Sequence, residues 1–213
     1  MAVELKENSG ESPWETERKQ RSVLNAEKRQ AIIKVASISF ASRGYHDTSM
    51  QDIARKLGVF KPTLYTFYKS KLALFDACVD QAVEIWLGAA RQARDHQGSA
   101  EDRLRIYLSR NFEFCATEFG KSLQNLELNE ISTSAEVQMR SMRSEVDRIF
   151  REIIEDGIGS GEISADFEPR LVSFALFGSF NFVSRWYKAD GEFTADEVLD
   201  QYFRMFFSGL KSQ

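Results

Sequence analysis

Residues 43–75 read RGYHDTSMQDIARKLGVFKPTLYTFYKSKLALF, and the caps and glycines in this stretch predict two short helices joined by a tight turn. Thr48 and Gln51 have the spacing of a capping box, so we expect the first helix to begin there. Gly58 predicts its end, because only glycine enters the left-handed backbone conformation without steric cost. Pro62 suits the first turn of a second helix, where a missing N–H is tolerated.

Two helices joined by a short glycine turn form the helix-turn-helix unit, whose second helix presents its N-terminal side chains to base edges in the DNA major groove. The side chains expected to read bases are Lys61, Thr63, Tyr65 and Thr66. Lysine donates to guanine, and threonine bonds to bases or touches the thymine methyl group. Leu64 and Tyr68 are expected to point back into the domain. The stretch therefore predicts binding to double-stranded DNA.

Residues 28–75, and above all the segment GVFKPTLYTFYKSKLAL, resemble the N-terminal domain of the tetracycline-repressor family of regulators. The resemblance implies base contacts by Lys61, Pro62, Thr63 and Tyr65, and phosphate contacts by Thr48, Tyr65 and Lys71. Two positions depart from the family pattern. Phe60 stands where the family usually has a Ser or Thr cap, and Phe67 stands where it often has a phosphate-binding His.

The distribution of charge agrees with a DNA-binding N-terminal region. The chain has a net charge of −4, but residues 18–75 carry +9, residues 1–17 carry −4 and residues 76–213 carry −9. A local basic field attracts a polyanion even when the whole chain is acidic. Charge alone also fits a merely solvated basic face, so the capped helix pair carries the prediction.

The remaining sequence predicts an all-α fold with a three-helix DNA-binding domain at residues 25–75 and a larger helical ligand-binding and dimerisation domain at residues 76–213. Residues 1–24 are polar and are expected to form a mobile arm, either a solubilising tail or a basic segment that reaches the minor groove through Arg18, Lys19 and Arg21. The expected helices are Asn25–Ser42, Lys71 to near Gly98, Ser99–Phe119 ended by Gly120, a helical stretch at 121–130, Ala135–Asp156, Pro169–Tyr187, and a Thr194-capped helix to Leu210.

The last two helices are apolar around most of their circumference, which predicts burial on two sides. One side is the core of the chain itself, and the other is expected to be a second copy in a four-helix bundle, as the family resemblance also implies. Phe177 and Phe203 are assigned to this homodimer interface. A helix buried inside a monomer is the alternative.

A regulator needs an input signal, and polar residues on apolar helix faces indicate where it binds. Asn111 and Asn181 lie on such faces, and aromatic residues of neighbouring helices suit an apolar ligand. The predicted pocket is Trp86, Tyr107, Asn111, Phe114, Phe177 and Asn181. The segment WYKADGEFTADEV at 186–198 resembles relatives that sense acyl-CoA or other hydrophobic molecules.

These features predict a repressor released from a palindromic operator by an apolar small molecule, such as an acyl-CoA. An activator, or a protein-binding adaptor without a ligand, is the alternative. Two histidines, and no cysteine or carboxylate cluster at metal spacing, favour neither an enzyme nor a metal or cofactor site. Cys78 and Cys115 fit reduced core residues, and the sequence has no signal peptide or apolar run of 18 residues, so we expect a cytoplasmic protein without a membrane partner.

Overall fold

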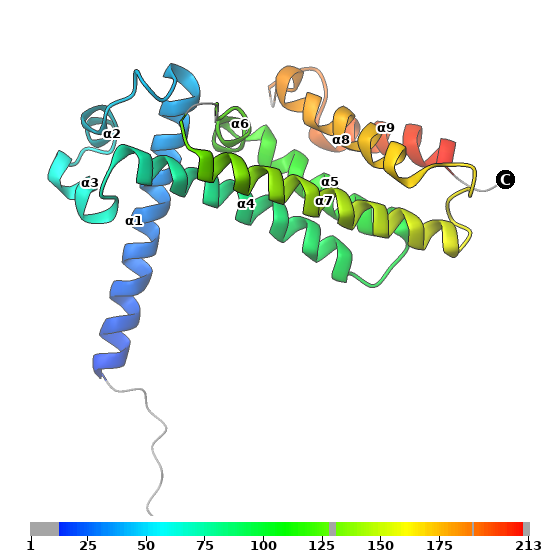
Figure 1. The fold of residues 1–213 in the computed structure, drawn as a ribbon, viewed down its shortest axis with the longest axis horizontal. Helices are drawn as coiled ribbons and strands as arrows, with labels where there is room; N and C mark the ends of the chain where they lie inside the picture. The colour runs from blue at the N-terminus through cyan, green and yellow to red at the C-terminus, as the bar shows by residue number, and fades with distance from the viewer. Residues whose placement is uncertain (1–12, 128–130, 189, 211–213) are drawn as a thin grey trace, which may run out of the picture.

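The computed structural model describes residues 13–127, 131–188 and 190–210, and the secondary structure in these ranges is helical throughout (Figure 1). The helices are α1 (Pro13–Arg43), α2 (Met50–Lys56), α3 (Lys61–Phe67), α4 (Lys71–Asp95), α5 (Ala100–Ala116), α6 (Glu118–Gln124), α7 (Thr133–Gly159), α8 (Pro169–Trp186) and α9 (Ala195–Leu210). The all-α prediction is confirmed.

The C-terminal half of α1 packs with α2 and α3 to form the N-terminal domain. Its core includes Phe40, Ile53, Leu64 and Phe75, each no more than 3% exposed. Gly58 has φ of +68° directly after α2, as the glycine turn predicted. This apolar core fixes the angle between α2 and α3, so it positions the helix expected to meet DNA.

The start of α2 differs from the prediction by one residue. Ser49 is the N-cap, its hydroxyl accepts from Asp52 N, and the Asp52 carboxylate accepts from Ser49 N at 3.2 Å. The capping box is therefore Ser49 with Asp52 rather than Thr48 with Gln51. The Ser49 hydroxyl also donates to the Asp52 carboxylate at 2.6 Å, and this bond and the one from Ser49 N lower the pKa of the Asp52 carboxyl group because they stabilise its charged form.

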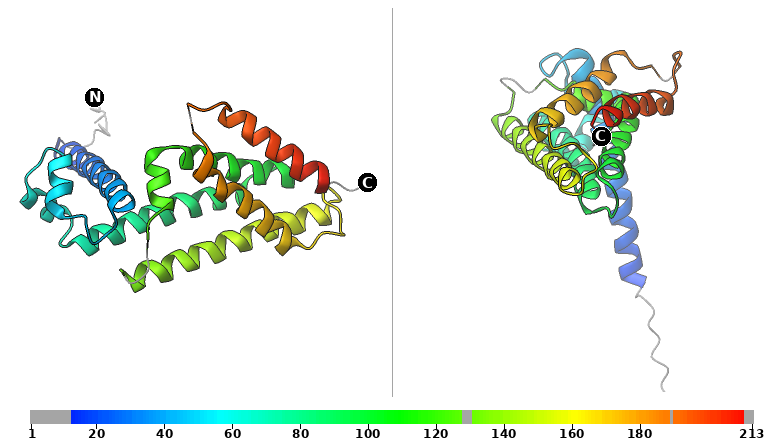
Figure 2. Two further views of the ribbon diagram at one scale, coloured as in Figure 1. Left: turned by 90° about the horizontal axis from the view of Figure 1, so that it is seen from above. Right: turned by 90° about the vertical axis from the view of Figure 1, so that its right-hand side faces the viewer.

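The first helix begins at Pro13 rather than Asn25, so residues 13–24 are helical and not an unstructured arm. Proline is favourable in the first turn of a helix, and most of the following residues are good helix formers. The N-terminal half of α1 projects away from the rest of the molecule (Figures 1 and 2), and Arg18, Lys19 and Arg21 on it are exposed. Residues 1–12 of the expected arm lie outside the described residues.

Helix α4 leaves the N-terminal domain and runs along the C-terminal domain, where it packs against α5 and α7 (Figures 1 and 2). The expected helix 99–119 ends at Ala116, and Thr117 caps a separate helix, α6. Gly120 lies inside α6 instead of ending α5. A Cβ at Gly120 would lie 1.9 Å from the carbonyl oxygen of Phe114, so this close corner between α5 and α6 requires glycine.

Helices α8 and α9 begin as predicted, with Pro169 in the first turn of α8 and with Thr194 and Glu197 forming a capping box for α9. Phe203 is 1% exposed and lies against Phe180, so it packs inside the chain's own core and its assignment to an interface is wrong. Phe177 is partly buried and stacks on Phe150 with 4.5 Å between ring centroids.

Candidate DNA interface and effector pocket

Helix α3 places every predicted base-reading residue on the surface. Lys61, Pro62, Thr63, Tyr65 and Thr66 are all exposed. The Lys61 ammonium lies 5.9 Å from the centre of the Tyr65 ring, so one cation and one aromatic side chain share this surface. An exposed helix face with hydroxyl, aromatic and cationic groups is chemically suited to bases and phosphates.

The opposite face of α3 anchors the helix. Leu64 and Tyr68 are buried, as predicted, at 0% and 8% exposure. Arg29 of α1 lies 5.6 Å from the ring centres of Phe67 and Tyr68 and donates to the Phe67 carbonyl oxygen at 3.4 Å. Phe67, which replaces the family's usual histidine, is therefore half-buried and packs against Arg29.

Two side chains expected to contact phosphate form hydrogen bonds with backbone carbonyl oxygens of the N-terminal domain. Thr48 is 1% exposed, and its hydroxyl lies within hydrogen-bonding distance of the carbonyl oxygens of Ser39 and Gly44, at 3.1 and 2.9 Å. Lys71 Nζ donates to the carbonyl oxygens of Tyr45 at 2.9 Å and Thr48 at 3.0 Å, and it lies 4.2 Å from the centre of the Tyr45 ring. Both side chains hold the loop between α1 and α2, so the structure does not support a direct phosphate contact by either one.

A cavity of about 610 Å³ lies among α4, α5, α7 and α8 in the C-terminal domain. Its lining includes Trp86, Tyr107, Asn111, Phe177 and Asn181, which the sequence assigned to the pocket. Further residues of α6, α7 and α8, among them Phe174 and Phe182 of α8, complete the wall and were not assigned to the predicted pocket. Met139, Met142 and Val146 follow one another on one face of α7 at helical spacing. This apolar stripe in the sequence could have indicated that they line the cavity.

The polar groups of this cavity lie in distinct places. Asn111 is 6% exposed, and its side-chain oxygen accepts from the Cys115 thiol at 3.5 Å. Gln124 Oε1 is buried without a hydrogen-bond partner among the described residues. Two exposed arginines, Arg143 and Arg185, also line the cavity. The Asp147 carboxylate lines the cavity as well, so apolar side chains are combined with two cationic groups and one anionic group.

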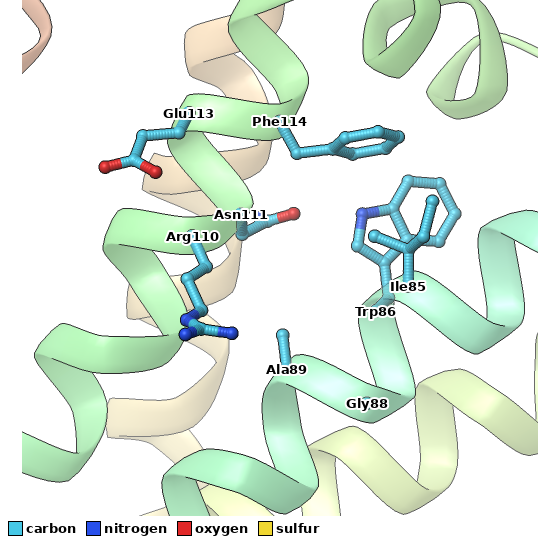
Figure 3. Close-up of a pocket in the computed structure, with 8 residues that line it drawn as sticks. All are labelled: Ile85, Trp86, Gly88, Ala89, Arg110, Asn111, Glu113 and Phe114. Carbon is cyan, nitrogen blue, oxygen red and sulfur yellow. The ribbon is translucent and has the colours of Figure 1, made fainter. Parts of the chain in front are cut away.

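Phe114 does not line this cavity, contrary to the prediction. It lines a second cavity of about 550 Å³ between α4 and α5, with Arg110 and Glu113 (Figure 3). Trp86 and Asn111 belong to both linings, so these two side chains stand between the two spaces.

The two cysteines are buried, as expected of core residues. Burial raises the pKa of the Cys78 thiol above its usual range and that of Cys115 to about 11. A thiol with a raised pKa is a poor nucleophile because little thiolate is present near neutral pH. Neither cysteine is suited to covalent chemistry or to a fast thiol switch.

Helix α6 connects the cavity to the DNA-binding domain. Gln124 and the adjacent Asn125 line the cavity, and Gln124 Nε2 donates to the Asn181 carbonyl oxygen of α8 at 3.3 Å. Two residues earlier, the Ser122 hydroxyl lies within hydrogen-bonding distance of the Ser37 hydroxyl of α1 at 3.0 Å and of the Phe119 carbonyl oxygen at 2.6 Å, and both serines are buried. A movement of α6 would therefore act on α1 directly.

No helix in the described part of the chain is both long enough and apolar enough to cross a membrane.

Comparison with known proteins identifies both halves of the chain. Residues 32–78 match the family described as bacterial regulatory proteins, tetR family, and residues 97–210 match the tetracyclin repressor-like, C-terminal domain. The HTH-type transcriptional repressor KstR2 of Mycolicibacterium smegmatis is 24% identical over 87% of this chain and 91% of its own length. The fatty acid metabolism regulator protein of Bacillus subtilis is 24% identical over 87% of this chain and 97% of its own.

Solved structures show the same fold. The structure of the ketosteroid transcriptional regulator KstR2 of Mycobacterium tuberculosis superposes with a TM-score of 0.76 at 21% identity, over 87% of this chain and 96% of the other. A regulator of the TetR/AcrR family from Thermobifida fusca gives a TM-score of 0.65 at 29% identity, over 87% of this chain and all of the other. Because the C-terminal family match alone spans more than half of the chain, the protein belongs to the tetracycline-repressor family of transcriptional regulators.

Proposed function

We propose that this protein is a ligand-responsive repressor that binds a palindromic operator as a homodimer in the cytoplasm and releases it when an amphipathic anion occupies the C-terminal cavity. The observation that carries the proposal is the shared position of α6, which lines the cavity through Gln124 and Asn125 and contacts α1 through Ser122. One helix therefore touches both the input site and the output domain.

Operator binding rests on α3, whose exposed face presents Lys61, Thr63 and Tyr65. A helix-turn-helix dimer reads two half-sites about one helical turn of DNA apart. The relative KstR2 is named a transcriptional repressor, which supports repression as the output.

Homodimerisation rests on the outer surfaces of α8 and α9. These helices leave large apolar side chains exposed, namely Leu171 at 65%, Phe174 at 50%, Phe182 at 59% and Met205 at 64%. Phe174 and Phe182 also lie at the border of the cavity. Monomers rarely expose so many neighbouring apolar side chains without a partner. We assign the dimer contact to this set in place of Phe177 and Phe203.

The chemistry of the cavity defines the class of effector. Its volume of about 610 Å³ lies in the range of small-molecule sites, and Trp86, Met142 and Phe177 supply apolar surface. Arg143 and Arg185 at its border suit phosphate or carboxylate groups. An acyl-CoA combines an apolar chain with phosphates, and a relative is named a fatty acid metabolism regulator.

The experiment begins with selection of an operator from random DNA, followed by titration with a fatty acyl-CoA series and with the matching free fatty acids. We expect acyl-CoA to raise the melting temperature and to weaken operator binding, because it binds the released conformation better. Operator must in turn weaken acyl-CoA binding by the same factor. Equal acyl-CoA affinity with and without operator would rule out the proposed switch.

A matched pair of arginines tests the charged border. Arg143→Gln removes a cation that lines the cavity, whereas Arg140→Gln removes an exposed cation one turn earlier on α7 that does not line it. We expect Arg143→Gln to weaken acyl-CoA binding by about two- to fivefold, with a smaller effect at high salt. Arg140→Gln should bind like the wild type. Equal effects of the two changes would show that the charge acts at long range rather than at the border.

A further inference from the structure

Phe60 is the most exposed large apolar side chain among the described residues, at 85%. It occupies the N-cap of α3, where it provides no side-chain hydrogen bond to the helix. The N-caps of α2, α4, α5, α6 and α7 are all Ser or Thr, and each accepts a backbone N–H. Glu168 at the N-cap of α8 makes no such hydrogen bond, but unlike Phe60 it is not apolar. Helix α3 therefore has no side-chain hydrogen bond at its N-cap, and the residue at this position exposes an aromatic ring to water.

Both features are unfavourable for folding alone. A Ser, Thr, Asp or Asn N-cap stabilises a helix relative to an apolar residue, and a solvated phenylalanine gains nothing from burial. Positions that break local folding rules without a compensating contact are expected at functional sites. Phe60 therefore calls for a partner outside the chain.

The position of Phe60 indicates which partner this is. It directly precedes Lys61, at the end of α3 that a helix-turn-helix directs toward base edges. Val59 and Tyr65 nearby are also exposed, at 38% and 43%. A phenyl ring has no donor or acceptor for a phosphate oxygen or a polar base edge. The apolar group that the major groove offers to such a ring is the C5-methyl of thymine.

We infer that Phe60 contacts the thymine methyl group at one position of each operator half-site and contributes to sequence preference there. This inference rests on operator binding by α3, and it adds a reading residue beyond the polar side chains of that helix. It also explains why a cap residue is absent at this one helix of the N-terminal domain.

The experiment exchanges single thymines of the selected operator for uracil, which removes only the methyl group. For the wild type we expect a loss of affinity of about fourfold at one thymine per half-site, the factor for one methyl group taken out of an apolar contact. Phe60→Ser should bind more weakly than wild type to the thymine operator and should show no uracil penalty at that position. Phe60→Leu, which keeps an apolar side chain, should retain part of the penalty.

Thermal stability separates this role from a structural one. Phe60→Ser adds a capping hydroxyl, so its melting temperature should be equal to or above that of the wild type even though its operator affinity falls. Phe167→Ser, at an exposed phenylalanine in the loop before α8, serves as the control and should leave operator affinity unchanged. A uracil penalty that is absent in the wild type, or equally large in Phe60→Ser, would overturn the inference. Failure of the wild type to select any DNA sequence would overturn the proposed function as well.

Discussion

Single residues of α3 divide cleanly between folding and recognition. Leu64 is fully buried, while its neighbours Thr63 and Tyr65 point outward. Because the two faces are separate, a substitution on the exposed face can change DNA binding while the core of the domain stays intact. The same separation shows that Thr48 and Lys71 belong to the folding side, since their polar atoms bind backbone groups of the domain.

Thr63→Ala tests direct base reading. We expect a loss of about 1 to 3 kcal/mol in binding to the preferred operator and a relaxed preference at one base pair, because the change removes the hydroxyl and methyl groups that are predicted to contact the base. Competition between the operator and random DNA measures this change. Equal losses on both kinds of DNA would show that Thr63 does not read sequence.

Lys71→Met tests the structural role of the ammonium group. Its hydrogen bonds to the carbonyl oxygens of Tyr45 and Thr48 would be lost, so the free energy of unfolding should fall by about 1 to 2 kcal/mol. Lys69→Met, at an exposed lysine in the loop before α4, is the matched control and should change stability little. Urea denaturation of the two variants decides the assignment. The opposite result would be a Lys71→Met protein that is as stable as the wild type and whose DNA binding depends less on salt, by about one unit in the slope of the logarithm of the binding constant against that of the salt concentration. That result would show that Lys71 contacts a DNA phosphate.

At the scale of helices, local signals predicted most of the fold. Gly58, Pro62, Ser99 with Asp102, Pro169 and Thr194 with Glu197 mark helix ends where the structure has them. Local signals failed where two residues compete for one role. Thr48 and Ser49 are both good caps, and only the packing of Thr48 against Ser39 decides between them.

It was harder to predict which surface covers a side chain than to predict that the side chain is covered. Phe177 and Phe203 were recognised as buried, but sequence periodicity cannot tell whether the covering surface belongs to the same chain or to a second copy. Phe150 and Phe180 of the same chain supply that surface. Trp86, Tyr107 and Phe177 of the predicted pocket line one cavity because they lie on inward helix faces, whereas Phe114 lines the neighbouring cavity.

Ser122→Ala tests the connection through α6. The change removes the hydrogen bond to Ser37 and leaves the cavity lining intact, so effector affinity of the free protein should change little. We expect the coupling between effector and operator to fall by about 0.5 to 2 kcal/mol. Ser144→Ala, at an exposed serine of α7, is the control. Operator release by acyl-CoA that is unchanged in Ser122→Ala would assign the coupling to α4 alone.

In the whole molecule, the basic region and the exposed apolar side chains of α8 and α9 lie in different domains. The basic region 18–75 contains the helix-turn-helix unit, and the exposed apolar side chains belong to α8 and α9. These two helices lie in the C-terminal domain (Figure 2). A dimer formed through the C-terminal domains would leave both basic regions free for one DNA duplex. Dimerisation and operator affinity should therefore fail together when the apolar set is altered.

Phe182→Glu tests whether the exposed apolar side chains of α8 and α9 form the contact between two copies. Phe182 is 59% exposed, so the monomer can accommodate a glutamate, but burial of that carboxylate against a second copy is strongly unfavourable. We expect sedimentation at micromolar concentration to show monomers that retain their melting transition and lose operator binding by at least tenfold. Val137→Glu, at a valine of α7 that is 58% exposed, should stay dimeric and bind the operator like the wild type. Phe203→Glu should instead unfold the chain, because its ring is 1% exposed within one copy. A dimeric Phe182→Glu protein would place the contact between copies elsewhere on the surface.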